Sequence, residues 1–223
     1  MKRVNFFLKR AFDICVSVVV LVVATVIPVM IVVPILIKLT SKGPAIYKQV
    51  RIGKDKKEFT LYKFRTMTTE RYDSEGNEIM SEQRISRFGR ILRKTSLDEL
   101  PQLFNVLNGT MSIVGPRPML DYQAPRCIGE ENLRFKVRPG LTGLAQVKGR
   151  NNILWEERIK YDIEYINNFN FWADIVIIFK TVFLVFRKVG TDLKPEYRGV
   201  DRFSKYYVPE QAQTEKEVTD TII

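Results

Sequence analysis

The hydrophobic positions of this chain form one long run near the N-terminus and several shorter periodic runs after it. No charged residue occurs from Ile14 to Ile37. A helix of that length extends about 36 Å, more than the roughly 30 Å hydrocarbon core of a bilayer. Over residues 1–13, Lys and Arg are interspersed with Phe and Leu. This pattern is typical of a segment at an anionic membrane surface, so residues 1–40 are predicted to be a membrane anchor.

Two features of the apolar run favour a re-entrant helix hairpin, which enters and leaves the membrane on one face. Pro28 lies near its middle, where proline breaks or kinks a helix. Basic residues flank both ends, Lys9 and Arg10 before it and Lys38 and Lys42 after it, whereas the positive-inside rule expects one strongly basic side. A single span kinked at Pro28 is the alternative.

Beyond residue 40 the pattern predicts a mostly helical α+β domain over 41–193, followed by a polar, flexible tail over 194–223. Two β-prone runs at 45–50 and 59–64 predict a short β-hairpin. Helical periodicity predicts helices over 154–168 and 172–189. The second helix is apolar with a narrow polar stripe, so it lies either on a membrane or in the core.

Composition limits the chemistry that the chain can perform. The net charge is +11 and there is no histidine. The positive charge requires an anionic partner, such as nucleic acid, a membrane face or phosphorylated substrates. The lack of histidine excludes Ser-His and Cys-His nucleophiles and most zinc sites, which leaves carboxylates, Lys, Arg and a hard cation. A nucleic-acid partner accounts for the charge but not for the apolar run, and none is expected.

The candidate catalytic residues are the adjacent carboxylates Asp98 and Glu99. They precede Pro101 and the periodic apolar run of residues 100–109, which predicts a short helix whose positive N-terminal end carries both acids. Ser96 and Glu99 also fit a capping box. That alternative places Pro101 inside the helix, where its ring clashes with the preceding turn at a cost of about 3 kcal/mol. A helix that starts between Asp98 and Leu100 avoids the clash.

Several basic residues surround this acidic pair in the sequence, and each also has the ordinary interpretation of a solvated charge. Lys63 and Arg65 alternate at the end of the second predicted strand, so they point to one face and are candidates for a phosphate-facing pair. Arg117 stands between two prolines, a stiff setting that suits bidentate phosphate binding. The glycine-rich stretch 138–151 is predicted to be a loop that approaches a phosphate. A further cationic stripe at helical spacing comprises Arg84, Arg87, Arg90, Arg93 and Lys94.

The motifs together resemble the bacterial sugar transferases known as monotopic phosphoglycosyl transferases, in the small form that has only the catalytic core. The resemblance covers residues 1 to about 192 in the family's order. Its motifs are Lys9-Arg10-x-x-Asp13, Tyr62-Lys63-Phe64-Arg65-Thr66-Met67, Ser96-Leu97-Asp98-Glu99-Leu100-Pro101-Gln102, Gly115-Pro116-Arg117-Pro118, and Arg138-Pro139-Gly140-Leu141-Thr142-Gly143 with Gly149-Arg150. One departure is Ile27, because the family has serine before the proline that breaks the re-entrant helix.

The resemblance implies transfer of a phosphosugar from a UDP-sugar to a polyprenyl phosphate such as undecaprenyl phosphate, with release of UMP. Asp98 is then the nucleophile that forms a covalent intermediate, and Glu99 assists at the metal or in proton handling. Both acids would bind Mg²⁺. The residues expected near the substrate phosphates are Lys63, Arg93, Arg117 and Arg150.

The resemblance also implies a location and partners. A re-entrant hairpin and amphipathic interfacial helices would place the catalytic domain on the cytoplasmic face of the bacterial inner membrane, against anionic lipids. The reaction would be the first membrane step of capsule, O-antigen, exopolysaccharide or glycoprotein glycan assembly. A homodimer or downstream glycosyltransferases are left open as partners. The competing interpretation from the residues is a non-enzymatic basic adaptor at the membrane surface.

Overall fold

The computed structural model describes residues 2–26, 29–70, 72–73, 75–80, 83–149, 153–187 and 203. It confirms the mixed helix and sheet architecture. The helices are α1 (Lys2–Val26), α2 (Val29–Thr40), α3 (Arg87–Thr95), α4 (Gln102–Leu107), α5 (Leu144–Lys148), α6 (Trp155–Asn167) and α7 (Phe171–Arg187). The strands are β1 (Ile46–Ile52), β2 (Glu58–Phe64), β3 (Ser112–Val114) and β4 (Gly140–Thr142). Turns of 3-10 helix cover Lys54–Lys56, Leu97–Glu99, Ala124–Arg126 and Gly129–Lys136.

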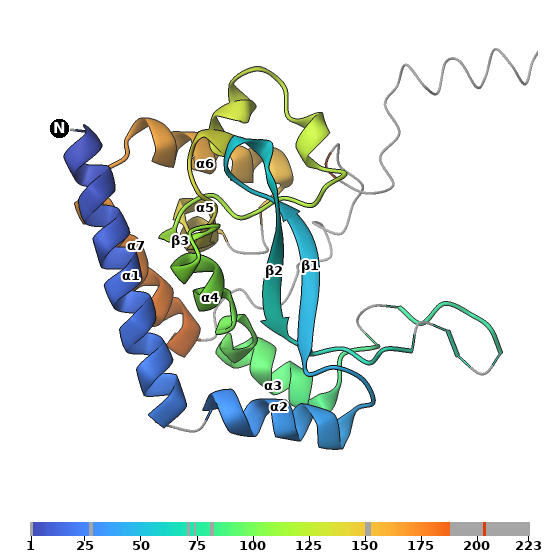
Figure 1. Cartoon of the computed structure of the whole chain (residues 1–223). Helices are drawn as coiled ribbons and strands as arrows, with labels where there is room; N and C mark the ends of the chain where they lie inside the picture. The colour runs from blue at the N-terminus through green and yellow to red at the C-terminus, as the bar shows by residue number, and fades with distance from the viewer. Residues whose placement is uncertain are drawn as a thin grey trace, which may run out of the picture.

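The predicted membrane segment forms α1 and α2, which run in different directions (Figure 1). Helix α1 combines the basic and aromatic residues 2–13 with the first half of the apolar run in one continuous helix. The predicted break at Pro28 lies outside the described residues. None of the described helices combines the length and the apolar character that a membrane crossing requires.

The predicted β-hairpin is confirmed, and its register determines which side chains share a face. Strands β1 and β2 are antiparallel, with Tyr47 opposite Lys63 and Arg51 opposite Phe59. Directly opposite residues point to the same side of a sheet, and so do residues two apart on one strand. Tyr47, Gln49, Arg51 and Lys63 therefore lie on one face, which is also the face through which Phe59 reaches the core.

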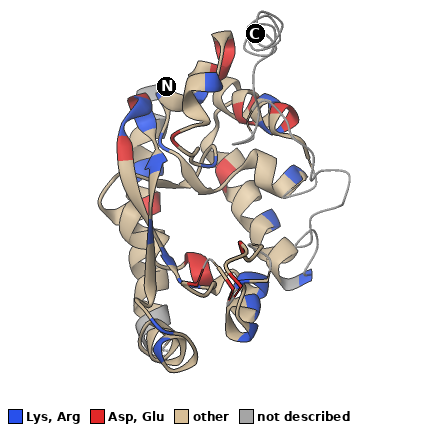
Figure 2. Cartoon of the chain, turned by 90° about the vertical axis from the view of Figure 1, so that its right-hand side faces the viewer, with Lys and Arg blue, Asp and Glu red and all other residues tan. Residues whose placement is uncertain are grey.

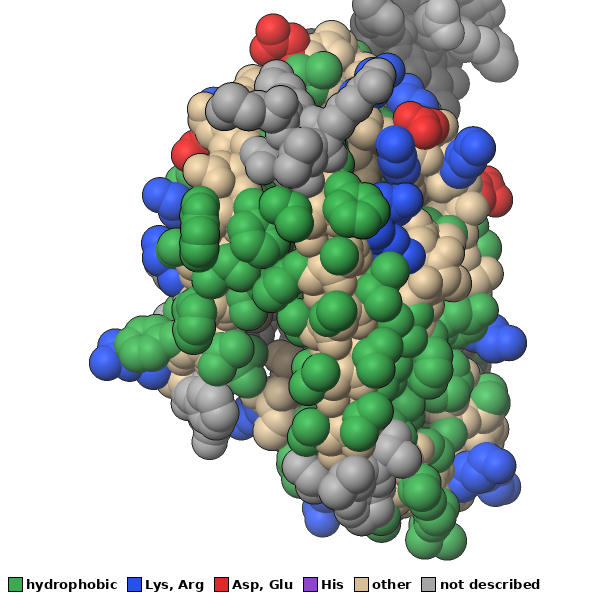
Figure 3. All heavy atoms as spheres, turned by 60° about the vertical axis from the view of Figure 1, so that its left-hand side comes forward, with side chains coloured by type: hydrophobic (Ala, Val, Ile, Leu, Met, Phe, Trp, Pro, Cys, Tyr) green, Lys and Arg blue, Asp and Glu red, His purple; other side chains and the backbone are tan. Residues whose placement is uncertain are grey.

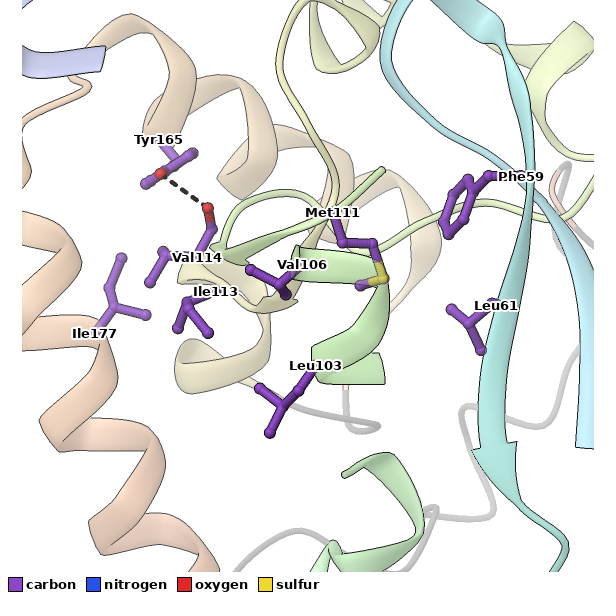
Figure 4. Packing of buried hydrophobic residues seen from close by; sticks show 9 residues of the cluster. All are labelled: Phe59, Leu61, Leu103, Val106, Met111, Ile113, Val114, Tyr165 and Ile177. Atoms are coloured by element: carbon purple, nitrogen blue, oxygen red, sulfur yellow. Dashed lines mark hydrogen bonds between the residues drawn. The ribbon is translucent and has the colours of Figure 1, made fainter. Parts of the chain in front are cut away.

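The largest hydrophobic cluster surrounds α4 and joins it to the hairpin on one side and to α7 on the other (Figure 4). Tyr165 closes the cluster beside α7, where its hydroxyl lies 2.8 Å from Asp174 Oδ1 and 3.3 Å from the carbonyl oxygen of Val114, so its one proton is shared between these two acceptors. The buried members are Phe59, Leu61, Leu103, Val106, Met111, Ile113, Val114, Tyr165 and Ile177. This packing holds the short segment before α4 against the end of the hairpin.

The glycine-rich stretch 138–151 is not the loop that its composition predicts. It contains β4, which pairs in parallel with β3, and the short helix α5. A Cβ at Gly140 or Gly143 would collide with the backbone of Gly115. These two glycines therefore allow backbone segments to pack closely on each other, a role that composition alone does not distinguish from a close approach to a ligand.

Helices α6 and α7 confirm the predicted helices. One side of α7 packs in the core and another side is exposed and apolar, so both predicted environments, the core and a membrane-facing surface, suit parts of this helix. Ile177 packs in the core, whereas Trp172 and Phe179 on the same helix are exposed. Of the predicted polar stripe, Asp174 is buried and Thr181 bonds to Thr142, while the third member, at position 188, lies outside the described residues. Of the predicted tail, the structure describes Phe203, which is buried beside α6.

Candidate active site

The acidic pair lies in a tight turn rather than at the start of a helix. Helix α3 ends at Ser96, whose backbone is left-handed with φ 56°. The 3-10 turn Leu97–Glu99 follows directly, and α4 begins only at Gln102 with Pro101 as its N-cap. The Ser96 side chain caps nothing in this turn, so the capping-box alternative is wrong. The predicted helix start between 98 and 100 is also wrong, because the chain completes this separate turn first.

Glu99 is fixed by two cations from different parts of the chain. Its Oε1 lies 2.7 Å from Lys63 Nζ and 3.3 Å from Arg117 Nη2. Burial alone would raise the pKa of Glu99, but Lys63 and then Arg117 outweigh it and lower the pKa to about 2. Glu99 is therefore ionised at neutral pH. It orients Lys63, which lies on β2, and Arg117, which lies in the loop after β3.

Asp98 has the opposite electrostatic setting. It is only 8% exposed, and the described residues place no ion-pair partner on its carboxylate. Burial, with a smaller contribution from the adjacent charge of Glu99, raises the pKa of Asp98 to about 6, although Lys63 and Arg93 act to lower it. Such a carboxylate is weakly solvated and not committed to a structural contact, which are properties of a reactive group.

The other basic residues predicted to bind phosphate differ in where the structure places them. Arg93 lies on α3, in the row of basic positions visible in Figure 2, and its Nε donates to Thr66 Oγ1 at 2.9 Å. Arg117 is at the site through its contact with Glu99. Arg150 lies outside the described residues. Arg65 does not form a phosphate-facing pair with Lys63, because its buried guanidinium donates to the carbonyls of residues 41 and 42 at 2.7 Å each.

Sequence reasoning missed Arg51 and Gln49 as site residues. Arg51 donates to Gln49 Oε1 through Nη2 at 2.7 Å and Nε at 3.2 Å, and through Nη1 to the carbonyl of Pro118 at 3.1 Å. Burial, with the neighbouring charge of Arg117, lowers the pKa of Arg51 to about 10. Strand alternation places Lys63 on one face of the hairpin. Combined with the hairpin register, it also identifies Arg51 and Gln49 as residues of that face.

The first motif of the chain attaches α1 to the domain that carries this site. Lys9 Nζ lies 2.6 Å from Asp174 Oδ2 on α7. Asp13 is buried and accepts a hydrogen bond from Ser112 Oγ at 2.6 Å. Arg10 donates to the carbonyl of Val106 at 2.7 Å, near the end of α4. These contacts couple the expected membrane helix to the segment that follows Asp98 and Glu99.

The two adjacent carboxylates have the chemistry that a magnesium ion shared with a substrate would require, although Glu99 already pairs with Lys63 and Arg117. In the part of the chain that the structure describes, no group of three or more His, Cys, Asp or Glu residues is arranged to hold a metal. Mg²⁺ typically uses one or two carboxylates together with substrate phosphates and water. Asp98 and Glu99 supply that number of carboxylates, and Asp98 has no competing cation on it among the described residues.

Comparison with known proteins identifies similar chains. The family described as bacterial sugar transferase matches residues 4–188. A Bacillus subtilis protein named uncharacterized sugar transferase EpsL is 46% identical over 175 residues, which cover 78% of this chain and 85% of that protein. The undecaprenyl-phosphate galactose phosphotransferase of Salmonella typhimurium is 40% identical over 210 residues, which cover 85% of this chain and 42% of that protein.

A third relative extends the same pattern. The UDP-glucose:undecaprenyl-phosphate glucose-1-phosphate transferase of Klebsiella pneumoniae is 44% identical over 189 residues, which cover 81% of this chain and 40% of that protein. The chain thus spans less than half the length of the two relatives named for a substrate. The family match covers all the motifs described above, from Lys9 to the end of α7. The chain belongs to the bacterial sugar transferase family.

Proposed function

We propose that this chain transfers a phosphosugar from a UDP-sugar to a polyprenyl phosphate and releases UMP. The observation that carries the proposal is the contrast between the two acids. Glu99 is held ionised by Lys63 and Arg117, whereas Asp98 is buried, feels the charges of Lys63 and Arg93, and has no ion-pair partner in the described structure. The named relatives that act on undecaprenyl phosphate and a sugar support the choice of substrates.

The reaction proceeds in two steps at one phosphorus atom. An oxygen of ionised Asp98 attacks the phosphorus that carries the sugar, and the bond from this phosphorus to the UMP oxygen breaks, so that UMP leaves. The product is a covalent aspartyl-phosphosugar. An oxygen of the polyprenyl phosphate then attacks the same phosphorus, and the bond to Asp98 breaks, which regenerates the carboxylate. Two steps allow a water-soluble donor and a lipid acceptor to use one site in turn.

The surrounding residues reduce the repulsion between a carboxylate and an anionic diphosphate. Lys63, Arg93 and Arg117 bring positive charge to the point where negative charge accumulates. Glu99 holds Lys63 and Arg117 in fixed positions, so the site is organised before the donor binds. When Mg²⁺ is bound at Asp98 and Glu99, it supplies further neutralisation of the phosphate oxygens. Arg150 is proposed to contribute in the same way from its place after α5.

We propose that α1 and α2 form the re-entrant anchor and that the domain 41–193 sits on the cytoplasmic face of the inner membrane. Hydrophobic side chains gather over α1 and α7 on one face of the molecule (Figure 3). They include Val18, Val19, Val22, Trp172, Phe179 and Phe183. An apolar face of this extent on a basic protein suits an anionic lipid surface, and it would bring the site to the level of the lipid phosphate.

The test is UMP release by the full chain with a panel of UDP-sugars in the presence of undecaprenyl phosphate. At least one UDP-sugar should give UMP and a lipid-linked sugar diphosphate. Asp98→Asn should abolish both products, because an amide cannot act as the nucleophile. A basic adaptor without activity would release no UMP from any donor, and its membrane binding would not depend on Asp98.

A further inference from the structure

Arg51 is a partly buried cation that forms no ion pair with an acidic side chain in the described structure. Its hydrogen bonds go to the neutral Gln49 side chain and to the carbonyl of Pro118. These bonds use only part of the fork of N–H donors that a guanidinium carries. A charge taken out of water is normally paired or hydrogen-bonded to an anion. The arrangement therefore fixes the orientation of Arg51 without a directly bonded anion, although the charge of Glu99 also acts on it.

A second guanidinium, that of Arg117, exerts an electrostatic effect on Arg51. Arg51 is bonded to the backbone of the segment Pro116–Pro118, and that segment carries Arg117, whose charge acts on Arg51 strongly enough to help lower its pKa. Glu99 contacts Arg117 but also pairs with Lys63. One carboxylate is thus shared between two cations, and Arg51 adds a third on the same face of the hairpin as Lys63.

We propose that Arg51 and Arg117 together bind the diphosphate of the nucleotide donor, and that Gln49 is a positioning residue that orients Arg51. The proposal deepens the proposed function and rests on it for the identity of the donor. Two guanidinium groups held at fixed angles suit the several oxygens of a diphosphate, because each planar fork binds phosphate oxygens in a bidentate way. An incoming diphosphate would also relieve the repulsion between the two arginines.

The two arginines would bind a phosphate group, and both the nucleotide donor and the lipid acceptor carry one. The test therefore measures the binding of each separately. The measurements are the Kd of UDP for the purified full chain, by calorimetry in detergent, and the KM for polyprenyl phosphate. Arg51→Met should raise the Kd of UDP about tenfold or more and leave the KM for the lipid within about twofold. Gln49→Leu should weaken UDP binding in the same direction, and Arg51→Lys should restore part of it.

Lys48→Met is the matched control, because it removes one positive charge from a β1 position three residues before Arg51 and on the opposite face. It should bind UDP as the parent does. Parent-like UDP binding by Arg51→Met, with an unfolding temperature that shows it is folded, overturns the proposal. A raised KM for the lipid with unchanged UDP binding also overturns it, since it assigns Arg51 to the acceptor.

The UDP measurement is independent of turnover, so the two proposals fail separately. Should the chain release no UMP from any donor while UDP binding still depends on Arg51, the transfer reaction is wrong and the anion site stands. Should UMP release and its dependence on Asp98 be observed while Arg51→Met binds UDP normally, the anion site is wrong and the transfer reaction stands.

Discussion

Arg10 Nη1 lies 2.7 Å from the carbonyl oxygen of Val106, so the first helix of the chain is tied to the last turn of α4. A second bond from the same guanidinium reaches the carbonyl of Leu107 at 3.2 Å. Carbonyls at a helix C-terminus lack intrahelical donors, and a cation there is favourable. Because α4 follows the acidic turn, this contact relates the position of α1 to that of Asp98.

Replacing Arg10 should therefore affect both stability and transfer. Arg10→Met removes one hydrogen bond from each of two carbonyls, although that of Val106 keeps the bond from Gly109 N–H, and it should lower the free energy of unfolding by about 1–3 kcal/mol. UMP release should fall several-fold, and Arg10→Lys should recover part of both. Arg90→Met, at an exposed position on α3, removes the same charge and should match the parent. Thermal unfolding and initial rates measure the two effects, and a parent-like Arg10→Met would show that α1 is not coupled to the site.

Lys63 is expected to be required for transfer through its contact with Glu99. Lys63→Met removes the shorter of the two ion pairs on Glu99, so the acid turns to Arg117 alone and the pKa of Glu99 rises. The rate of UMP release should fall about tenfold or more, with a smaller loss for Lys63→Arg. An unchanged rate in Lys63→Met would mean that Glu99 does not organise the site.

The raised pKa of Asp98 makes a prediction about stability. Folded Asp98 keeps its proton up to about pH 6, whereas an unfolded aspartate releases it near about pH 4. Between about pH 4 and about pH 6 the folded state thus binds more protons than the unfolded state. The free energy of unfolding therefore falls as the pH rises through this range. In EDTA, Asp98→Asn should be more stable than the parent at pH 8, by up to about 3 kcal/mol, and the difference should disappear near pH 4.

Glu99→Gln is the control with the opposite sign. In the parent protein the pKa of Glu99 is lowered to about 2. Ionised Glu99 therefore stabilises the folded state at pH values above the pKa of an unfolded glutamate. That contribution is lost as the pH falls toward about 2. Glu99→Gln should therefore be less stable than the parent at pH 8. Unfolding temperatures measured from pH 4 to pH 8 test both variants, and shifts of the same sign for the two would contradict this electrostatic assignment.

The apolar face of α7 is expected to bind lipid. Phe179 is 71% exposed and Phe183 is 53% exposed on that helix. Replacing both with serine removes apolar area from the interface and should reduce the fraction that sediments with vesicles containing anionic lipid. Tyr72→Ser, at a 62% exposed position in the loop between β2 and α3, should leave that fraction unchanged. Equal sedimentation of the double variant and the parent would exclude α7 from the membrane contact.

The elements with strong periodicity were predictable from the sequence. The β-hairpin, α6 and α7 follow alternation or helical spacing over whole elements, and those signals do not depend on distant contacts. The acidic pair was also found, because two carboxylates before a proline are unusual in a basic chain. Its local geometry does not follow from the sequence, since a left-handed residue at the end of a helix is usually glycine or asparagine, whereas here it is Ser96.

Long-range contacts account for the other differences. The bond from Arg65 to the residues after α2 turns an expected phosphate ligand into a structural residue. The sequence alone does not assign Arg51 to the site, because the hairpin register is needed to place it on the same face as Lys63 and the bond to Pro118 links it to the segment that carries Arg117. The glycines at 140 and 143 face another backbone rather than a ligand. Each case depends on a residue far away in the sequence.

The covalent step is tested most directly by incubating the full chain with a radiolabelled UDP-sugar in the absence of polyprenyl phosphate. We predict that label becomes bound to the protein and is released by hydroxylamine. Borohydride reduction of the labelled protein should release the phosphosugar and leave homoserine at position 98. Asp98→Asn should bind none, and Arg90→Met should bind as much as the parent. Two results would contradict the account. The first is a protein that binds no label and still forms product once the lipid is added. The second is any product formed by Asp98→Asn.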